Sequence, residues 1–401
     1  MPLAIAVLAV GVFCVNTTEI MVAGLLPSIS EAFGVSVSSV GYLVSVFALT
    51  MVVGGPLLTV ALLRASRKKA LIGLLLVFVA GQLLGAVAQD YWVLVVSRVV
   101  TALAASAFYG IAVAVSARLV GPDMRARALS VLMSGMMVAQ VVGLPVAAFV
   151  DQHFGWRASF YGLAALAALC ALLVWARVPD SPVPQKVNLR GELDSFRNRA
   201  LWAAYGTNAL VIGSVVAAFS YFAPIFEELT GFPSGVTPLL FALFGIGTIA
   251  GNMVTGRLAD RYMMPVLLYG LAGLTAVLAA FALVAENKPA TVVAVAVLGV
   301  IGLPLNPALG VRVMRLADDG PMVSTVNASA VNVGVALGPW VAGLAISAEM
   351  GLRAPLWVGA AMALAGLLSL LPALGRGGRA ATGDRHEPAG REPAADREPV
   401  R

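Results

Sequence analysis

The sequence predicts an all-α integral membrane protein whose twelve transmembrane helices form two pseudo-symmetric six-helix bundles. Composition is the first reason, because 60% of the 401 residues are apolar and only 11% are charged, which excludes an ordinary water-soluble enzyme. Length is the second, because apolar runs of about 19 to 25 residues recur from Leu3 to Leu374 and each can cross the roughly 30 Å hydrocarbon layer as a helix. The third reason is that the charge of the segments between these runs alternates.

Charged or Pro/Gly-rich breaks delimit the predicted helices. The first run has no basic segment before it and contains Glu19, so we expect a retained helix and not a cleaved signal peptide. The longest break, 178–198, is polar, and we expect it to be a cytoplasmic linker between an N-terminal bundle, 1–177, and a C-terminal bundle, 199–374. The tail, 375–401, is rich in Arg, Glu, Pro, Gly and Ala, which predicts a disordered cytoplasmic segment. The predicted spans are 3–26, 39–62, 70–88, 91–117, 128–150, 157–177, 200–224, 236–256, 263–284, 291–313, 322–347 and 354–374.

Basic residues predict the orientation of these helices. Sixteen of them lie after the even-numbered spans as far as the tenth, whereas the opposite segments hold mainly acids and only Arg157, Lys288 and Arg353 as bases. The positive-inside rule therefore predicts that the basic end faces the cytoplasm, and an even number of spans puts both termini there. The net charge of +6 follows this topology and gives no support for nucleic-acid binding. We expect a multi-pass protein of a bacterial inner membrane.

Two similar segments indicate that the halves are repeats. Gly54 to Arg64 follows the second span and Gly251 to Arg261 follows the eighth, 197 residues later, as duplicated six-helix bundles require. From these residues the chain resembles the major facilitator superfamily, specifically its twelve-span drug:proton antiporters. Gly256, Asp260 and Arg261 look like the superfamily's cytoplasmic loop motif. Its first-half copy is formed by Gly55, Pro56, Arg64, Arg67 and Lys68, with Leu63 where the motif usually has an aspartate.

Four further segments narrow the resemblance. Ser97-Arg98 in the fourth span resembles a motif that places an arginine inside the membrane, and Gly143-Leu-Pro145 in the fifth is similar to an exporter-associated Gly/Pro motif. The segments 16–27 and 152–157 look like the branch that contains sugar-efflux, nucleoside-efflux and chloramphenicol-resistance permeases. Members of that branch transport different classes of substrate. The resemblance therefore implies alternating-access, proton-coupled efflux of small amphipathic compounds without naming a single substrate. It also implies gating roles for the two copies of the loop motif and for Gly143 and Pro145.

One acid and one base, Glu19 and Arg98, lie inside the predicted spans away from their ends. Burying either ion alone costs at least about 2.5 to 3.5 kcal/mol, so each should face a partner or a water-filled cavity. Both fall roughly 6 Å to the outer side of the bilayer centre at 1.5 Å per residue. Spans one and four are neighbours in the resembling superfamily, which makes contact possible.

The role of Glu19 has three interpretations. Burial favours its protonated form and Arg98 favours its carboxylate, so opposed influences could make it a proton carrier that couples inward proton flow to efflux. Alternatively, the two residues form a permanent ion pair that holds two helices together. Glu19 could also recognise a cationic substrate directly, alone or together with proton carriage.

Uncharged polar residues inside the spans are the candidate substrate contacts. Each amide could bind substrate or a neighbouring helix, and Asn306 is favoured because Pro304 and Pro307 would free nearby backbone carbonyls. Small residues beside Tyr109 could open a cavity or let helices pack closely. The candidates are Asn16, Tyr109, Asn208, Asn306, Asn327 and Asn332.

Other classes of function have little support. Only two histidines occur, His153 and His386, and no phosphate-binding glycine loop is present, so the sequence predicts neither an enzyme nor a metal, cofactor or ATP requirement. The expected partners are a small-molecule substrate, protons and the lipid bilayer, and we expect a monomer. Export of a sugar or nucleoside is the first alternative function, and a non-transporting membrane sensor or channel is the second.

Overall fold

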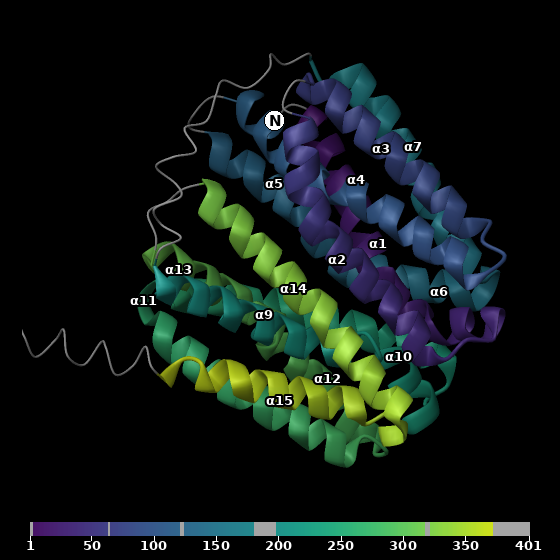
Figure 1. Ribbon diagram of the computed structural model, residues 1–401, viewed down its shortest axis with the longest axis vertical. Coiled ribbons are helices and arrows are strands. Elements are labelled where there is room, and N and C mark those ends of the chain that lie inside the picture. Colours follow the sequence, from purple (N-terminus) through teal and green to yellow (C-terminus); the bar gives the residue numbers. More distant parts are fainter. Residues whose placement is uncertain (1–2, 63–64, 121–123, 180–197, 317–320, 372–401) are drawn as a thin grey trace, which may run out of the picture.

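The computed structural model describes residues 3–62, 65–120, 124–179, 198–316 and 321–371, and the regular elements in this part of the chain are helices, with no strand (Figure 1). Eleven helical segments there are long and apolar enough to span a membrane, and the shorter apolar helix α15 supplies the twelfth. The predicted all-α architecture is confirmed. The long helices of the first half are α1 (Leu3–Phe33), α2 (Val37–Ala61), α3 (Arg67–Ala86), α4 (Tyr91–Arg118), α5 (Arg125–Val138), α6 (Leu144–Phe154) and α7 (Trp156–Arg177).

The second half repeats this pattern with more interruptions. The predicted linker 178–198 and tail 375–401 fall almost entirely outside the described residues. The main helices are α9 (Arg199–Phe219), α10 (Phe222–Pro224), α11 (Thr237–Val284), α12 (Lys288–Ile301), α13 (Asn306–Leu316), α14 (Pro321–Ala345) and α15 (Ala354–Leu368), and the short segments are η4 (Ile225–Leu229), η5 (Ser234–Val236), η6 (Leu303–Leu305) and η7 (Ile346–Met350).

Local chemistry fixes several helix ends. The Asp90 side chain accepts hydrogen bonds from the backbone N–H groups of Trp92 and Val93 and so begins α4. Asn198 and Asn287 cap α9 and α12 in the same way. Gly34 has φ 61° between α1 and α2, a conformation that glycine adopts without a steric penalty.

Four predicted spans are less regular than expected. The spans 236–256 and 263–284 follow each other directly as two membrane-spanning segments, Ser234–Ala259 and Arg261–Val284, joined within α11 by a kink where Tyr262 leaves helical geometry with φ −124° and ψ 40°. The predicted break between the two spans is this kink, although Gly256 and Arg261 are themselves helical. The fifth span contains a π-helical turn, η2 (Ala139–Gly143), between α5 and α6. The tenth breaks at Gly302 and the η6 turn containing Pro304, because proline cannot donate a helical hydrogen bond.

The two halves meet through few elements. α2 packs against α14, α6 and η2 pack against α11, and α1 contacts α10. Close approach depends on glycine: a Cβ added at Gly245 of α11 would lie 2.8 Å from the Gln140 carbonyl oxygen of η2. Within the second half, Gly334 and Gly338 bring α14 against the backbone of α9. The spacing of Gly334 and Gly338, four residues apart on α14, thus serves packing inside one chain.

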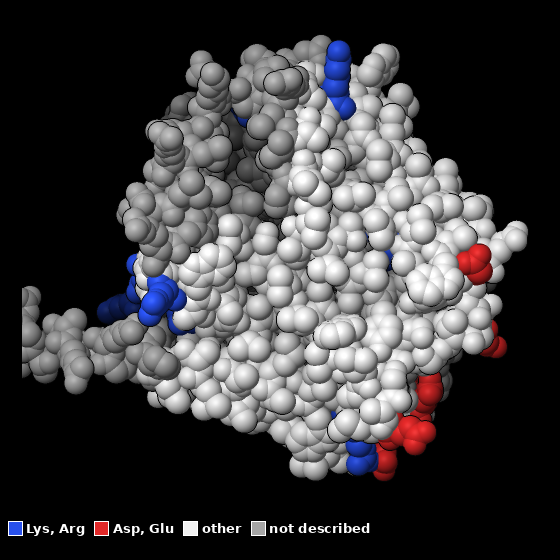
Figure 2. All heavy atoms as spheres, in the orientation of Figure 1, with Lys and Arg blue, Asp and Glu red and all other residues white. Residues whose placement is uncertain are grey.

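Charge separates along the molecule. Acidic side chains gather at one end in Figure 2, and basic side chains lie mainly toward the other. At the acidic end the halves are joined by a hydrogen bond between the Ser38 and Ser347 hydroxyl oxygens, which are 2.9 Å apart. Gln152 also donates to the Ser234 carbonyl oxygen across the two halves there. The acidic end is therefore where the halves are in closest polar contact.

Candidate functional site

A cavity of about 910 Å³ lies between the two halves. Its walls come from α1, α2 and α4 on one side and from α9, α13 and α14 on the other, with η2 contributing as well. Toward the basic end the lining includes Leu62, Ala65 and Arg67, which lie where α2 passes into α3. The cavity thus extends to the basic end, and most of its lining residues are apolar.

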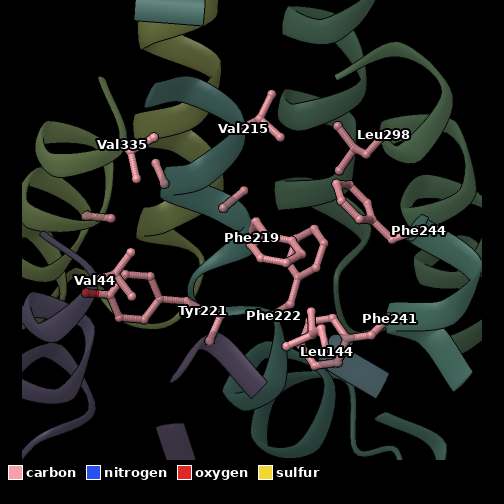
Figure 3. Packing of buried hydrophobic residues seen from close by; sticks show 14 of the residues in the cluster. Val44, Leu144, Val215, Phe219, Tyr221, Phe222, Phe241, Phe244, Leu298 and Val335 are labelled. Carbon is pink, nitrogen blue, oxygen red and sulfur yellow. The ribbon is translucent and has the colours of Figure 1, made fainter. Parts of the chain in front are cut away.

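An aromatic cluster closes the cavity toward the acidic end. Phe219 and Phe244 line the cavity, and their ring centroids are 5.1 Å apart. Phe222, which is buried, packs edge-to-face against both of them (Figure 3). Phe241 and Phe226 extend the cluster further. Several buried aromatic rings therefore separate the cavity from the acidic end.

Tyr221 completes this closure between α2 and α14. Its hydroxyl donates to the Pro339 carbonyl oxygen at 3.1 Å. Gly41 on α2 and Gly343 on α14 lie directly against its ring and hydroxyl, where any side chain would collide with it. The three residues lock the acidic ends of the two halves together.

Glu19 lies in the cavity wall. The residue is half-buried on α1. Its carboxylate has no hydrogen-bond or ion-pair partner within the described part of the chain. A carboxyl group in this position is available to a proton or to a ligand in the cavity.

Arg98 lies on α4 and is fully buried. Its Nη1 donates to the Thr18 carbonyl oxygen at 2.8 Å and to the Thr18 hydroxyl oxygen at 3.3 Å. Its Nη2 donates to the Glu19 backbone carbonyl oxygen at 3.5 Å. The guanidinium carbon is 4.2 Å from the centre of the Phe47 ring, a cation–π contact.

Glu19 and Arg98 therefore meet through the backbone of α1. No ion pair within 4.0 Å joins their side chains in the described structure, so a permanent salt bridge is not what holds α1 and α4 together in this conformation. Hydrogen bonds from Arg98 to carbonyl oxygens perform that role. The proposed roles of both residues in coupling stay predictions.

Four of the six predicted substrate contacts line the cavity, namely Asn16, Tyr109, Asn306 and Asn332. Asn16 and Asn332 also donate to backbone carbonyls one turn back on their own helices. Asn306, at the start of α13, has no partner within the described residues and is exposed in the cavity. The free amide of Asn306 is therefore the best placed of the four to bind a ligand.

Asn208 and Asn327 lie elsewhere. The Asn208 amide donates to the Asn327 side-chain oxygen at 2.6 Å and so links α9 to α14. Neither residue is part of the cavity lining. The substrate-contact prediction for this pair is not supported by its position, and the helix-bridging alternative describes it better.

The predicted gating residues are distributed over both halves. Gly55 and Arg67 line the cavity. Gly143 lies so close to Thr17 that a Cβ would overlap the Thr17 hydroxyl, and Pro145 starts α6 immediately after η2. The Arg261 guanidinium lies 5.3 Å from the centre of the Tyr262 ring. Of the remaining predicted residues, Lys68 lies in the first turn of α3, Gly256 has open space around it, Pro56 and Asp260 lie in helices, and Arg64 is outside the described residues.

Comparison with known proteins identifies the chain. The sequence profile of the Major Facilitator Superfamily matches residues 8–327. The chain belongs to the major facilitator superfamily. It is 34% identical to the inner membrane transport protein YdhP of Escherichia coli O157:H7, covering 86% of this chain and 89% of YdhP. It is 35% identical to a chloramphenicol resistance protein of Streptomyces lividans, covering 93% of this chain and 96% of that protein.

Solved structures of transporters share the fold. A bacterial homologue of the human lysosomal transporter Spinster, in an inward-facing and unoccupied conformation, matches with a TM-score of 0.70 and 17% identity, covering 96% of this chain and 98% of that one. A nucleoside transporter matches with a TM-score of 0.76 and 15% identity, covering 92% and 98%. This chain is therefore a membrane transporter of the superfamily by sequence and by fold.

Sequence reasoning missed two glutamines in this superfamily member. Gln140, in the π-helical turn, lines the cavity without a partner for its amide within the described residues. Gln82 on α3 is fully buried and donates to the Thr18 hydroxyl oxygen. The available signal was an uncharged amide inside an apolar run, the same signal that singled out the asparagines.

Proposed function

We propose that the chain is a proton-coupled exporter that moves small amphipathic compounds, including antibiotics, out of the cell by alternating access. The observation that carries this proposal is the cavity between the halves, in which one acid, Glu19, faces a largely apolar space beside the buried cation Arg98. The 35% identical chloramphenicol resistance protein supports drug efflux.

Cavity chemistry favours the substrate class. Apolar residues such as Val15, Met51 and Val215 form most of the walls, so an apolar body is favoured by burial. The amides of Gln140 and Asn306 offer donors and acceptors to a polar group on the same ligand. A neutral or cationic amphipathic compound fits both features, and the Glu19 carboxylate would favour the cationic one.

Orientation follows from the charge distribution. The basic end would face the cytoplasm, with both termini inside an inner membrane. In that orientation the cavity extends toward the cytoplasm and the aromatic cluster around Phe222 closes the outer side. The conformation would thus be the one that loads substrate from inside.

Coupling would arise from competition at Glu19. A carboxyl group without a protein partner can take up a proton when the cavity opens outward and release it inside after substrate has left. One elementary charge crossing 100 mV supplies about 2.3 kcal/mol, equivalent to roughly a fifty-fold concentration ratio. That ratio is sufficient for resistance-type efflux.

Export of a sugar or nucleoside is the second candidate. The observation that favours it is that amides from both halves, Gln140 and Asn306, face the cavity without partners in the described structure. A hydroxyl-rich ligand would use more such groups than an amphipathic drug does. A sensor or channel has less support, since the family and the relatives are transporters.

Purified protein in proteoliposomes under an imposed pH gradient tests the proposal. Accumulation of a substrate only when protons flow in the opposite direction supports antiport, and flux that ignores the gradient indicates a pore. Glu19→Gln should abolish gradient-driven transport while the protein still inserts and purifies normally. The matched control is Glu31→Gln, an exposed acid on the same helix, which should transport like the wild type.

The substrate itself is identified in cells. A drug-sensitive bacterial host expressing the gene is grown against a panel that includes chloramphenicol, cationic amphipathic dyes, sugars and nucleosides. Resistance to amphipathic compounds that is lost with Glu19→Gln supports the proposal. Tolerance confined to sugars or nucleosides would favour the second candidate, and coupled transport that is unchanged in Glu19→Gln would remove this residue from the mechanism.

A further inference from the structure

The hydrogen bonds that hold Arg98 continue to a third helix. Gln82 on α3 donates through Nε2 to the Thr18 hydroxyl oxygen, and Arg98 donates to the same oxygen at 3.3 Å. Thr18 on α1 therefore joins an amide from α3 to a guanidinium from α4. All three residues are completely buried. A polar network of this kind holds its members in one arrangement when its bonds are formed.

The network leaves specific atoms unused. Arg98 Nε and Gln82 Oε1 are buried and have no hydrogen-bond partner. The guanidinium has five N–H donors, and those that are used point to the oxygens of Thr18 and Glu19 on α1. One edge of Arg98 is thus fixed against α1 while its Nε remains free. Unpaired buried donors are unfavourable and are uncommon in native structures.

Glu19 is the charged group that Arg98 faces. Among the described residues of α1, α2 and α3 that surround Arg98, the contacts are Thr18, the Glu19 backbone, the Phe47 ring and, through Thr18, the Gln82 amide. Because Arg98 donates to the backbone carbonyl oxygen of Glu19, its positive charge lies beside this residue and favours the ionised carboxylate. Any movement of the guanidinium therefore changes how strongly the Glu19 carboxylate is stabilised.

We propose that Gln82 is a positioning residue for the proton-coupling step: acting through the Thr18 hydroxyl, it fixes Arg98 so that the guanidinium stabilises the Glu19 carboxylate once the proton has left. The inference rests on the proposed role of Glu19 in coupling. Gln82 itself touches neither the cavity nor Glu19. Its effect is therefore on the protonation of Glu19 and not on the affinity for substrate.

Infrared difference spectroscopy tests the proposal without a transport assay. The carboxylic-acid band of Glu19, identified by its absence in Glu19→Gln, is titrated in the purified wild-type protein and in Gln82→Leu, which keeps side-chain size but removes the amide. Gln82→Leu should move the midpoint to higher pH by at least about half a unit, because a less well-held cation stabilises the carboxylate less. Thr18→Val should give the same shift, and the double variant should shift no further, since both changes break one network.

A control variant separates positioning from packing. The Ser97 hydroxyl on α4 donates to the Gly81 carbonyl oxygen on α3 at 2.9 Å, so Ser97→Ala removes a buried bond between the same two helices without touching Thr18. Ser97→Ala should leave the Glu19 midpoint unchanged. Gel filtration and thermal unfolding of every variant show whether it is folded. If Gln82→Leu is not folded, the titration of Thr18→Val decides the test.

Transport adds a second readout. With substrate in proteoliposomes, Gln82→Leu should lower the maximal coupled rate about three- to tenfold while KM stays within about twofold of the wild type.

The possible results distinguish the two proposals. A Glu19 band that titrates equally in wild type and Gln82→Leu overturns the role of Gln82 and leaves proton coupling standing. If Gln82→Leu shifts the Glu19 midpoint but the wild-type protein shows no proton-driven transport, the role of Gln82 is supported and the proposed function is overturned. A band that does not titrate in the wild type overturns both. A shift that Ser97→Ala reproduces also overturns the role of Gln82, because helix packing would then explain it.

Discussion

Gly41→Ala should shift the conformational balance of the transporter away from the structure described here. In this conformation a methyl group at Gly41 would overlap the Tyr221 hydroxyl oxygen and lie 2.5 Å from Cζ and 2.9 Å from Cε1 of that ring. The ring is completely buried and its hydroxyl is bonded to Pro339, so it has little freedom to move. Gly41 and Tyr221 belong to different halves, and alternating access requires these halves to separate at the acidic end.

The expected size follows from the cost of overpacking. A methyl group forced into a packed site destabilises it by about 1 to 3 kcal/mol. This penalty applies only to the conformation in which α2 contacts Tyr221. Every 1.4 kcal/mol changes a conformational ratio about tenfold, so the ratio of closed to open acidic ends should fall by roughly 5- to 150-fold. Tyr221→Phe in the same protein removes the nearest overlapping atom and should restore part of the ratio.

Distances between spin labels measure this shift. Labels replace Glu31 and Glu349, which are exposed, lie on different halves and are close along the chain to the bonded pair Ser38 and Ser347. The distance distribution should move to longer values in Gly41→Ala. Gly73→Ala is the matched control, because this exposed glycine of α3 has nothing within 4 Å of an added Cβ. An unchanged distribution in Gly41→Ala, or an equal change in Gly73→Ala, would refute the reasoning.

Two further predictions concern stability. Burial raises the pKa of Glu227, and a hydrogen bond from Thr237 at 2.7 Å opposes this increase. The folded protein therefore binds this proton more tightly than the unfolded chain does. As the pH rises above the ordinary pKa of a glutamate side chain, the folded state loses stability relative to the unfolded chain. Thermal unfolding of Glu227→Gln should show a gain in stability at pH 7 that disappears near pH 4, and a variant that is equally stable or less stable at pH 7 would contradict this. Asn208→Leu alone should lower the free energy of unfolding by about 1 to 3 kcal/mol, because it leaves Asn327 without its buried partner. Adding Asn327→Leu should recover most of this loss. Full transport by the double variant would confirm that neither side chain binds substrate.

Fold and topology could be predicted because the membrane imposes them. Apolar runs of fixed length and alternating charge leave few arrangements open, and the twelve helices follow. The helical geometry that continues through Gly256 and Arg261 to the kink at Tyr262, and the π-helical turn at Ala139–Gly143, could not be predicted from these signals. Both depend on tertiary packing, because an apolar run has the same sequence pattern whether its helix is straight, bent or locally widened.

The candidate site was only partly predictable for a similar reason. The cost of buried charge identifies Glu19 and Arg98 and requires surroundings that tolerate them. Depth alone does not give the rotation of each helix or the direction of a side chain, so the carbonyl contacts of Arg98 were not foreseen. The rotation of each helix about its own axis also determines that Asn306 faces the cavity whereas Asn208 faces α14. Gln82 escaped notice because an uncharged amide is easier to bury than an ion.

The π-helical turn lets the fifth span hold an additional residue without changing which faces its two parts present. Such a turn holds one residue more than an α-helical turn, so deleting a single residue within Ala139–Gly143 would restore regular α-helical geometry. Because the wider turn absorbs the additional residue locally, α5 and α6 would keep about the same rotation relative to each other, with Met136 in the cavity lining and Leu144 against Gly24. The deletion would instead remove the widened turn that brings Gln140 into the lining and its carbonyl oxygen against Gly245, so it would change the cavity at one place only.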